Sequence, residues 1–203
     1  RFIGIVSASI LTVATSACVG TEKFRIEPSV TDIGSEWATR KIPGRYRIAI
    51  DASRAISARS LPSGVSGKCV FTTDMRASYK GSIIRALHQI FESPPDFAAS
   101  PRSPDLSDQL GDLLIRVRIV SIAGGCRGAE CYASVGVGAA IQGTFLNGRK
   151  IDDELFANIQ KSEIMFGNLS FCRPMSELID KAANGTQYQS IKQVGQKLLS
   201  ATK

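Results

Sequence analysis

The feature that most constrains the fold is a pair of long alternating runs followed by a tight turn. In residues 112–122 apolar side chains alternate with Arg116 and Arg118, and residues 132–146 alternate in the same way. A period of two is typical of β-strands with one buried face. Asn147-Gly148 then predicts a two-residue type I′ hairpin turn, because that turn needs positive φ at both positions. We therefore expect an antiparallel meander with one apolar face and one face that meets solvent or a partner.

The remaining elements can be placed by periodicity and by helix-breaking residues. A strand is expected at about 45–51 and the returning strand of the meander at about 150–164. Apolar residues recur at three- and four-residue spacing over 75–92, which predicts a helix that Thr73 or Asp74 caps. Residues 57–68 and 93–111, rich in Ser, Gly and Pro, are interpreted as loops.

A last helical region opens at Phe171-Cys172-Arg173-Pro174 and is expected to break at Asn184-Gly185 before it resumes. The order is then strand, helix, three-strand meander, helix. This order predicts an α+β fold, with a mainly antiparallel sheet of about four strands and helices packed on one face.

The start of the chain has the composition of an export signal. Residues 2–17 form an uncharged, largely apolar run that ends in small residues before Cys18. The run is shorter than the roughly 20 residues that a membrane-spanning helix needs. Ordinary cleavage after Ala17 is one interpretation, because Thr15 and Ala17 satisfy the small-x-small rule.

The same stretch resembles the bacterial lipoprotein signal. Ser16, Ala17 and Cys18 match that signature, and Thr15 stands where Leu is usual. The resemblance implies a signal peptide over 1–17 and a mature N-terminus at Cys18 that carries diacylglycerol and an N-linked acyl chain such as palmitate. Val19 stands where an Asp would resemble an inner-membrane retention signal, which favours an outer-membrane anchor facing the periplasm. The expected organisation is a lipidated N-terminus and tether over 18–44 and one domain over 45–203, with secretion as the alternative location.

Cysteine parity favours the lipoprotein interpretation. The chain has five Cys, and an unpaired thiol is awkward in an oxidising compartment. Lipidation of Cys18 leaves four, which we pair as Cys126–Cys131 across a hairpin tip and Cys69–Cys172 between the two helix starts. Four cysteines allow three connectivities, so this pairing is a hypothesis. A four-thiolate zinc site is the rival, but the spacing does not match a paired ribbon and export favours oxidation.

No motif specifies a reaction. The net charge is +7, but the basic residues are scattered without a run of five, so we expect no nucleic-acid partner. His88 is the sole histidine and is interpreted as a surface or boundary residue. Asp152 and Glu154 share one strand face and are interpreted as a solvated hairpin flank; no Gly-x-Ser-x-Gly motif accompanies them. No metal and no cofactor is expected, and any small-molecule ligand is left open.

These observations favour a membrane-anchored lipoprotein whose periplasmic domain is not an enzyme. We expect an accessory or binding subunit of an envelope transport, secretion or assembly machine, with the membrane and an envelope protein as partners. The alternative is an exported hydrolase or glycan-modifying enzyme that uses carboxylates. A third interpretation, a secreted eukaryotic disulfide-stapled domain, would involve glycans at Asn168 or Asn184, and Trp37 is a candidate rim residue for a partner or glycan.

Overall fold

The computed structural model of the protein describes residues 21–29, 40–63, 67–98, 110–164 and 172–202. Cys18, Trp37 and Asn168 lie outside these ranges, as do residues 99–109 of the loop expected over 93–111. Within that span the loop interpretation was wrong for Asp96–Ala98, which form a strand, and for Gly111, which begins another. The described residues form eight strands and two helices.

The larger sheet has five strands in the order β5-β2-β6-β7-β8. Its strands are β2 (Tyr46–Arg54), β5 (Asp96–Ala98), β6 (Gly111–Arg127), β7 (Glu130–Thr144) and β8 (Lys150–Ile164). The β6-β7-β8 part is the antiparallel meander that the alternating runs predict. β2 runs parallel both to β6 and to β5. The turn that joins β7 to β8 is not the predicted two-residue type I′ turn, because Gly148 has a positive φ of +76° but Asn147 does not. The Gly148 N–H donates to the Phe145 carbonyl oxygen at 2.9 Å.

A second sheet has three strands in the order β1-β4-β3. They are β1 (Thr21–Ile26), β3 (Ile56–Ser63) and β4 (Gly67–Asp74). β3 and β4 are antiparallel, whereas β1 runs parallel to β4. The strand β1 belongs to the segment that the sequence assigned to a tether, so the folded body begins by residue 21.

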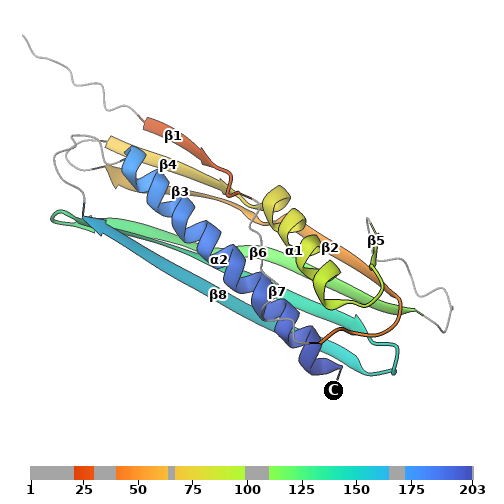
Figure 1. The fold of residues 1–203 in the computed structure, drawn as a ribbon. Helices are drawn as coiled ribbons and strands as arrows, with labels where there is room; N and C mark the ends of the chain where they lie inside the picture. Colours follow the sequence, from red (N-terminus) through yellow and green to blue (C-terminus); the bar gives the residue numbers. More distant parts are fainter. Residues whose placement is uncertain (1–20, 30–39, 64–66, 99–109, 165–171, 203) are drawn as a thin grey trace, which may run out of the picture.

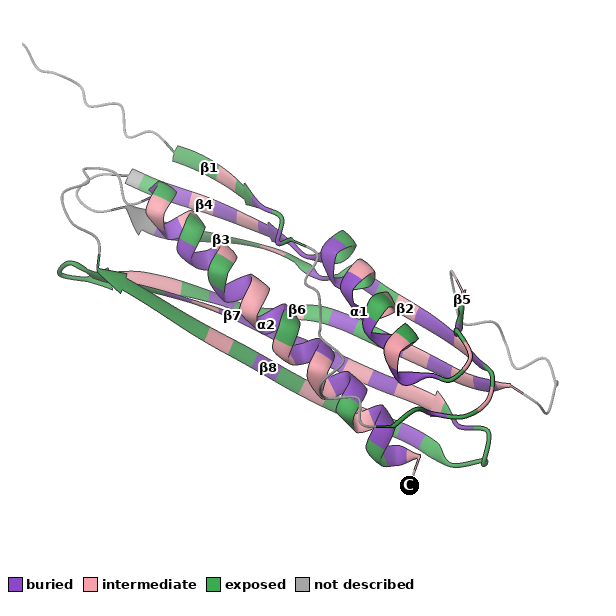
Figure 2. Ribbon diagram, viewed as in Figure 1, coloured by how far each residue is buried: buried purple, intermediate pink, exposed green. Residues whose placement is uncertain are grey.

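Two helices, α1 (Arg76–Ile90) and α2 (Cys172–Ala201), lie against these sheets. α2 runs lengthwise over β7 and β8, and α1 lies beside α2 and over β2 (Figure 1). Residues at the contact between α2 and β7 are buried, whereas most residues of β8 are exposed (Figure 2). The core therefore lies between the helices and one face of the large sheet.

The α+β class and the packing of helices on a sheet are confirmed, but the sheet prediction was wrong in two respects. There are eight strands rather than about four, and the sheets are mixed rather than mainly antiparallel. Residues 57–68 were interpreted as a loop, but those of them that the structure describes, 57–63 and 67–68, lie in β3 and β4. Pro62 lies in β3, an edge strand, which is where a strand tolerates proline. The parallel pairs join segments far apart in sequence, and periodicity does not reveal such partners.

The expected break at Asn184-Gly185 was also wrong, because α2 is continuous there. A Cβ at position 185 would lie 3.3 Å from Ile159 Cγ2, so the glycine lets the helix approach β8 closely. The next residue, Thr186, explains why the approach is favourable. Its hydroxyl accepts the Ile159 N–H at 3.1 Å and lies 2.8 Å from the carbonyl oxygen of Val135. Tertiary packing thus overrides the local turn signal.

Candidate functional site

The large sheet has one face turned away from α2, which we call the open face. On β8, Asp153, Ile159 and Glu163 contact α2, so the even-numbered residues of this strand point the other way. Arg118 and Glu154 lie on the open face, with side chains 53% and 60% exposed. Arg116 and Arg118 therefore point away from the core, as their alternation predicted.

A hollow of about 520 Å³ lies on this face. One row of residues crosses it from strand to strand, in the order Asp51, Arg116, Ala140, Glu154. β7 contributes small residues that leave room between the long side chains of its neighbours. The lining consists of Asp51, Ser53, Arg54, Arg116, Val117, Arg118, Gly138, Ala140 and Glu154.

Polar contacts connect the strands across the open face. Arg116 Nη1 donates to Gln142 Oε1 at 2.5 Å, and Gln142 Nε2 donates to Asp152 Oδ1 at 3.0 Å. Arg118 forms an ion pair with Glu154. Asp152 and Glu154 do share a face, as predicted, but each already binds a polar or cationic side chain.

Asp51 lies at the β2 side of the hollow and is held ionised. Hydrogen bonds from Ser53, first from its hydroxyl and then from its backbone N–H at 3.0 Å, lower the pKa of the Asp51 carboxyl below its ordinary value. The positive charges of Arg116 and Arg54 act in the same direction. An ionised Asp51 is a poor proton donor at neutral pH.

The hollow presents charged groups that are suited to ionic recognition. It presents three guanidinium groups and two carboxylates, some of them already paired, around a floor of small residues. Surface charge pairs of this kind give specificity and orientation more than raw affinity. Sequence reasoning found Arg116, Arg118 and Glu154 but missed Asp51, Ser53 and Arg54. No local signal indicates that β2 pairs with β6, so their proximity could not be foreseen.

The structure joins the same cysteine pairs that the sequence suggested. Cys69 and Cys172 form a disulfide with a Cα–Cα distance of 5.6 Å, which links the beginning of β4 to the beginning of α2. Cys126 and Cys131 form another, with 4.0 Å between Cα atoms, and they are directly opposite across the β6–β7 tip. The four sulfurs thus lie in two separate pairs instead of around one point.

The other candidate residues lie apart from the hollow. His88 is exposed on α1 and stacks on Phe97 at 5.5 Å between ring centroids. The Asn184 side chain donates to Asp180 O and accepts from the Ser29 hydroxyl. Within the described ranges, no group of three or more His, Cys, Asp or Glu side chains is arranged to hold a metal ion.

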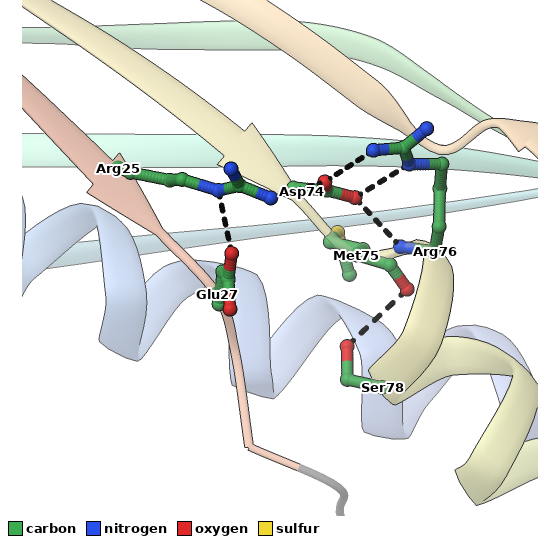
Figure 3. A network of polar contacts seen from close by, with 6 residues as sticks. All are labelled: Arg25, Glu27, Asp74, Met75, Arg76 and Ser78. Atoms are coloured by element: carbon green, nitrogen blue, oxygen red, sulfur yellow. Dashed lines mark hydrogen bonds and ion pairs between the residues drawn. The ribbon is translucent and has the colours of Figure 1, made fainter.

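A second polar cluster surrounds the beginning of α1 (Figure 3). Asp74 accepts hydrogen bonds from Arg76 Nε at 2.8 Å, Arg76 Nη2 at 2.6 Å and the Arg76 backbone N–H at 3.2 Å. These bonds lower the pKa of the Asp74 carboxyl below its ordinary value, with a smaller contribution from Arg25. Met75 holds the N-cap position, so neither Thr73 nor Asp74 is the cap that the sequence suggested. The cluster stabilises the start of α1, and its basic and acidic side chains largely neutralise one another.

Comparison with known proteins finds several solved structures that are similar at low sequence identity. No family model and no curated protein matches the chain. Protein XCC0632 from Xanthomonas campestris, described with the family model DUF330, has 10% sequence identity and a TM-score of 0.49 over 88% of this chain and 95% of its own. Hypothetical protein CT253 from Chlamydia trachomatis has 13% identity and a TM-score of 0.39, covering 76% of this chain and 96% of its own.

A minor lipoprotein from Acinetobacter baumannii is a third similar structure. It has 6% identity and a TM-score of 0.38, over 76% of this chain and 90% of its own. Among the described residues, neither helix combines the length and apolar character needed to cross a bilayer.

Proposed function

We propose that this chain is a lipid-anchored protein of the bacterial envelope whose folded domain is a non-enzymatic accessory subunit. The observation that carries the proposal is the pairing of the cysteines. Four of the five form two disulfides in the folded body, and the fifth, Cys18, stands at the end of the lipobox-like stretch. The two disulfides are expected in an oxidising compartment, and acylation of Cys18 would leave no unpaired thiol there.

The proposed anchor is close to the folded domain. Only Val19 and Gly20 separate Cys18 from Thr21, the first residue of β1. Three Cα–Cα steps of about 3.8 Å span at most about 11 Å. The tether in this proposal is therefore residues 18–20 rather than 18–44, and the domain stays next to the membrane.

The accessory role is based on the open face. Its hollow offers three arginines and two carboxylates for ionic recognition, and the pKa of Asp51 is lowered rather than raised. Confinement to a membrane surface raises the effective concentration of this site near an envelope partner, so modest affinity is sufficient. We propose that the partner is a protein that carries complementary charges.

The anchor is tested by metabolic labelling with a fatty-acid probe. Wild type is expected to incorporate the probe, and Cys18→Ala is expected to lose all labelling because the acceptor thiol is gone. The matched control is the double variant Cys126→Ala/Cys131→Ala, which removes two other cysteine side chains and should label like wild type. Equal labelling of wild type and Cys18→Ala would contradict the anchor.

The binding role is tested by photo-crosslinking in cells. A benzophenone amino acid in place of Ala140, in the floor of the hollow, is expected to give a discrete cross-linked species. The control places the same group at Tyr188, which is 39% exposed on α2 away from the open face. Adducts of equal yield at both positions, or none at position 140, would count against a partner at the hollow.

A further inference from the structure

One end of the molecule holds several elements that are distant in sequence, and we call it the anchor end. Thr21, where β1 begins, pairs with Lys68, and the next pair along is Glu22 with Cys69. Cys69 is bridged to Cys172 at the start of α2. The β1 and α2 starts therefore lie together, as Figure 1 shows.

The tip of the β6–β7 hairpin belongs to the same end. A Cβ on Gly124, just before the tip, would lie 3.1 Å from Leu61 Cδ1 on β3 and 3.2 Å from Met175 Sδ on α2. Leu61 in turn pairs with Cys69. The anchor end thus consists of the β1 start, the Cys69–Cys172 bridge and the tip closed by Cys126–Cys131.

Two large apolar side chains are exposed near this tip. Tyr132 on β7 is 40% exposed and Ile164 on β8 is 64% exposed. Tyr132 pairs with Ser162 and Ile164 pairs with Glu130, so the two residues are diagonal neighbours on the open face. Arg127 in the tip and Lys68 on β4 are also exposed. An aromatic residue with a polar hydroxyl, an aliphatic residue and nearby cations are the side chains that settle at a membrane–water interface.

We propose that the anchor end rests on the bilayer surface, with Tyr132 and Ile164 in the lipid head-group region. This inference rests on the proposed anchor at Cys18, whose distance from Thr21 is at most about 11 Å. A body held so closely cannot keep its β1 end away from the lipid. Two exposed apolar side chains bind a bilayer weakly by themselves, but the anchor turns their contact into an intramolecular event.

The arrangement also determines where the hollow is held. Ala140 lies eight positions after Tyr132 along β7, about 27 Å at a rise of about 3.4 Å per residue. The strands therefore present the hollow well beyond the lipid head groups, on the side where a partner in the periplasm would meet it. The β7–β8 turn, at the other end of the strands, lies farther still from the bilayer.

The test uses the chain from Cys18 to Lys203 with Cys18 coupled through its thiol to a maleimide phospholipid. This coupling makes the result independent of acylation in cells. The protein is placed in vesicles of phosphatidylethanolamine and phosphatidylglycerol that contain a head-group spin label. A fluorescent amino acid replaces Ala129 in the near tip or, as control, Arg149 in the far turn. We expect strong quenching at position 129 and none at position 149; equal quenching, or none at 129, would overturn the docking proposal.

The two apolar residues are tested in the same vesicles. The double variant Tyr132→Ser/Ile164→Ser is expected to lose most of the quenching at position 129. Leu146→Ser, which removes a side chain of 41% exposure at the far end, should leave it unchanged. Circular dichroism checks that both variants are folded. Unchanged quenching in the double variant would show that these side chains do not hold the tip at the lipid. Failure of fatty-acid labelling in cells, by contrast, would contradict the anchor and not this geometry.

Discussion

Replacing both Cys69 and Cys172 by alanine is expected to lower the free energy of unfolding by about 4–5 kcal/mol. The disulfide closes a loop with a sequence separation of 103 residues, and loop-entropy arithmetic gives about 4.7 kcal/mol for a loop of about 100 residues. The bridge holds the start of α2 against the small sheet, so its loss should also loosen the anchor end. Urea unfolding without reductant measures the change.

The control is the double variant Cys126→Ala/Cys131→Ala. That pair has a sequence separation of only 5, for which the same arithmetic gives about 2 kcal/mol. Both double variants remove two sulfurs, so the difference between them reflects loop length together with one additional buried sulfur, because Cys126 is exposed whereas Cys69 and Cys172 are buried. Dithiothreitol added to wild type should lower stability by more than either double variant does. Equal losses from the two bridges would contradict the assignment of the long one as the main staple.

Gly143→Ala is expected to lower the free energy of unfolding by about 2–5 kcal/mol. Gly143 lies in β7 with φ of +150°, a backbone conformation that side chains rarely adopt. A Cβ there would lie 2.1 Å from Asp112 O and 2.9 Å from Leu113 Cα, and both contacts are with the backbone of β6. Relief would require the two central strands to separate. Urea unfolding of the variant measures the loss.

Gly128→Ala is the matched control for that substitution. Gly128, in the β6–β7 tip, has φ of +63°, but a Cβ at this position would meet no heavy atom within 4 Å. Gly128→Ala therefore tests the effect of the positive φ without steric crowding. We expect it to lower the free energy of unfolding by about 1–2 kcal/mol. If the two alanine variants lost the same stability, the close approach at Gly143 would not be the cause.

The parts of the fold that sequence reasoning found are those with a local cause. The meander follows from alternation and from the turn signal at Asn147-Gly148, although the turn is not the expected type I′. The helix α1 follows from its apolar stripe and the prolines that end it. No local sequence pattern predicts the small sheet, because β1 and β4 pair in parallel across more than forty intervening residues. Gly143 was also missed: alternation drew attention to Gly136 and Gly138, but only the register with β6 shows which glycine meets backbone.

The residues of the candidate site likewise include some that the sequence predicts and some that it does not. Arg116 and Arg118 were expected to face solvent or a partner, since their period of two places them opposite the core. Asp51 and Arg54 come to the same hollow only through the parallel pairing of β2 with β6. The Cys126–Cys131 pair was accessible to sequence reasoning because it flanks a hairpin tip. The Cys69–Cys172 pair was expected to join two helix starts, and that reason was wrong, because Cys69 lies within β4 and α1 begins only at Arg76.

The disulfides and the open face fit one physical account together with the proposed anchor. In that proposal a short acylated N-terminus holds the disulfide-linked body against the membrane, and the long strands hold the charged hollow toward a partner. Such a role needs positioning and ionic complementarity, and the lowered pKa of Asp51 suits it. The account depends throughout on the chemistry of Cys18.

The most direct measurement is therefore the mass of the native mature protein, isolated from membranes without reductant. The account predicts a chain that begins at Cys18 and carries acyl groups on that residue alone, with no free thiol after unfolding. A mature chain with an unmodified Cys18, or with free thiols among Cys69, Cys126, Cys131 and Cys172, would contradict it.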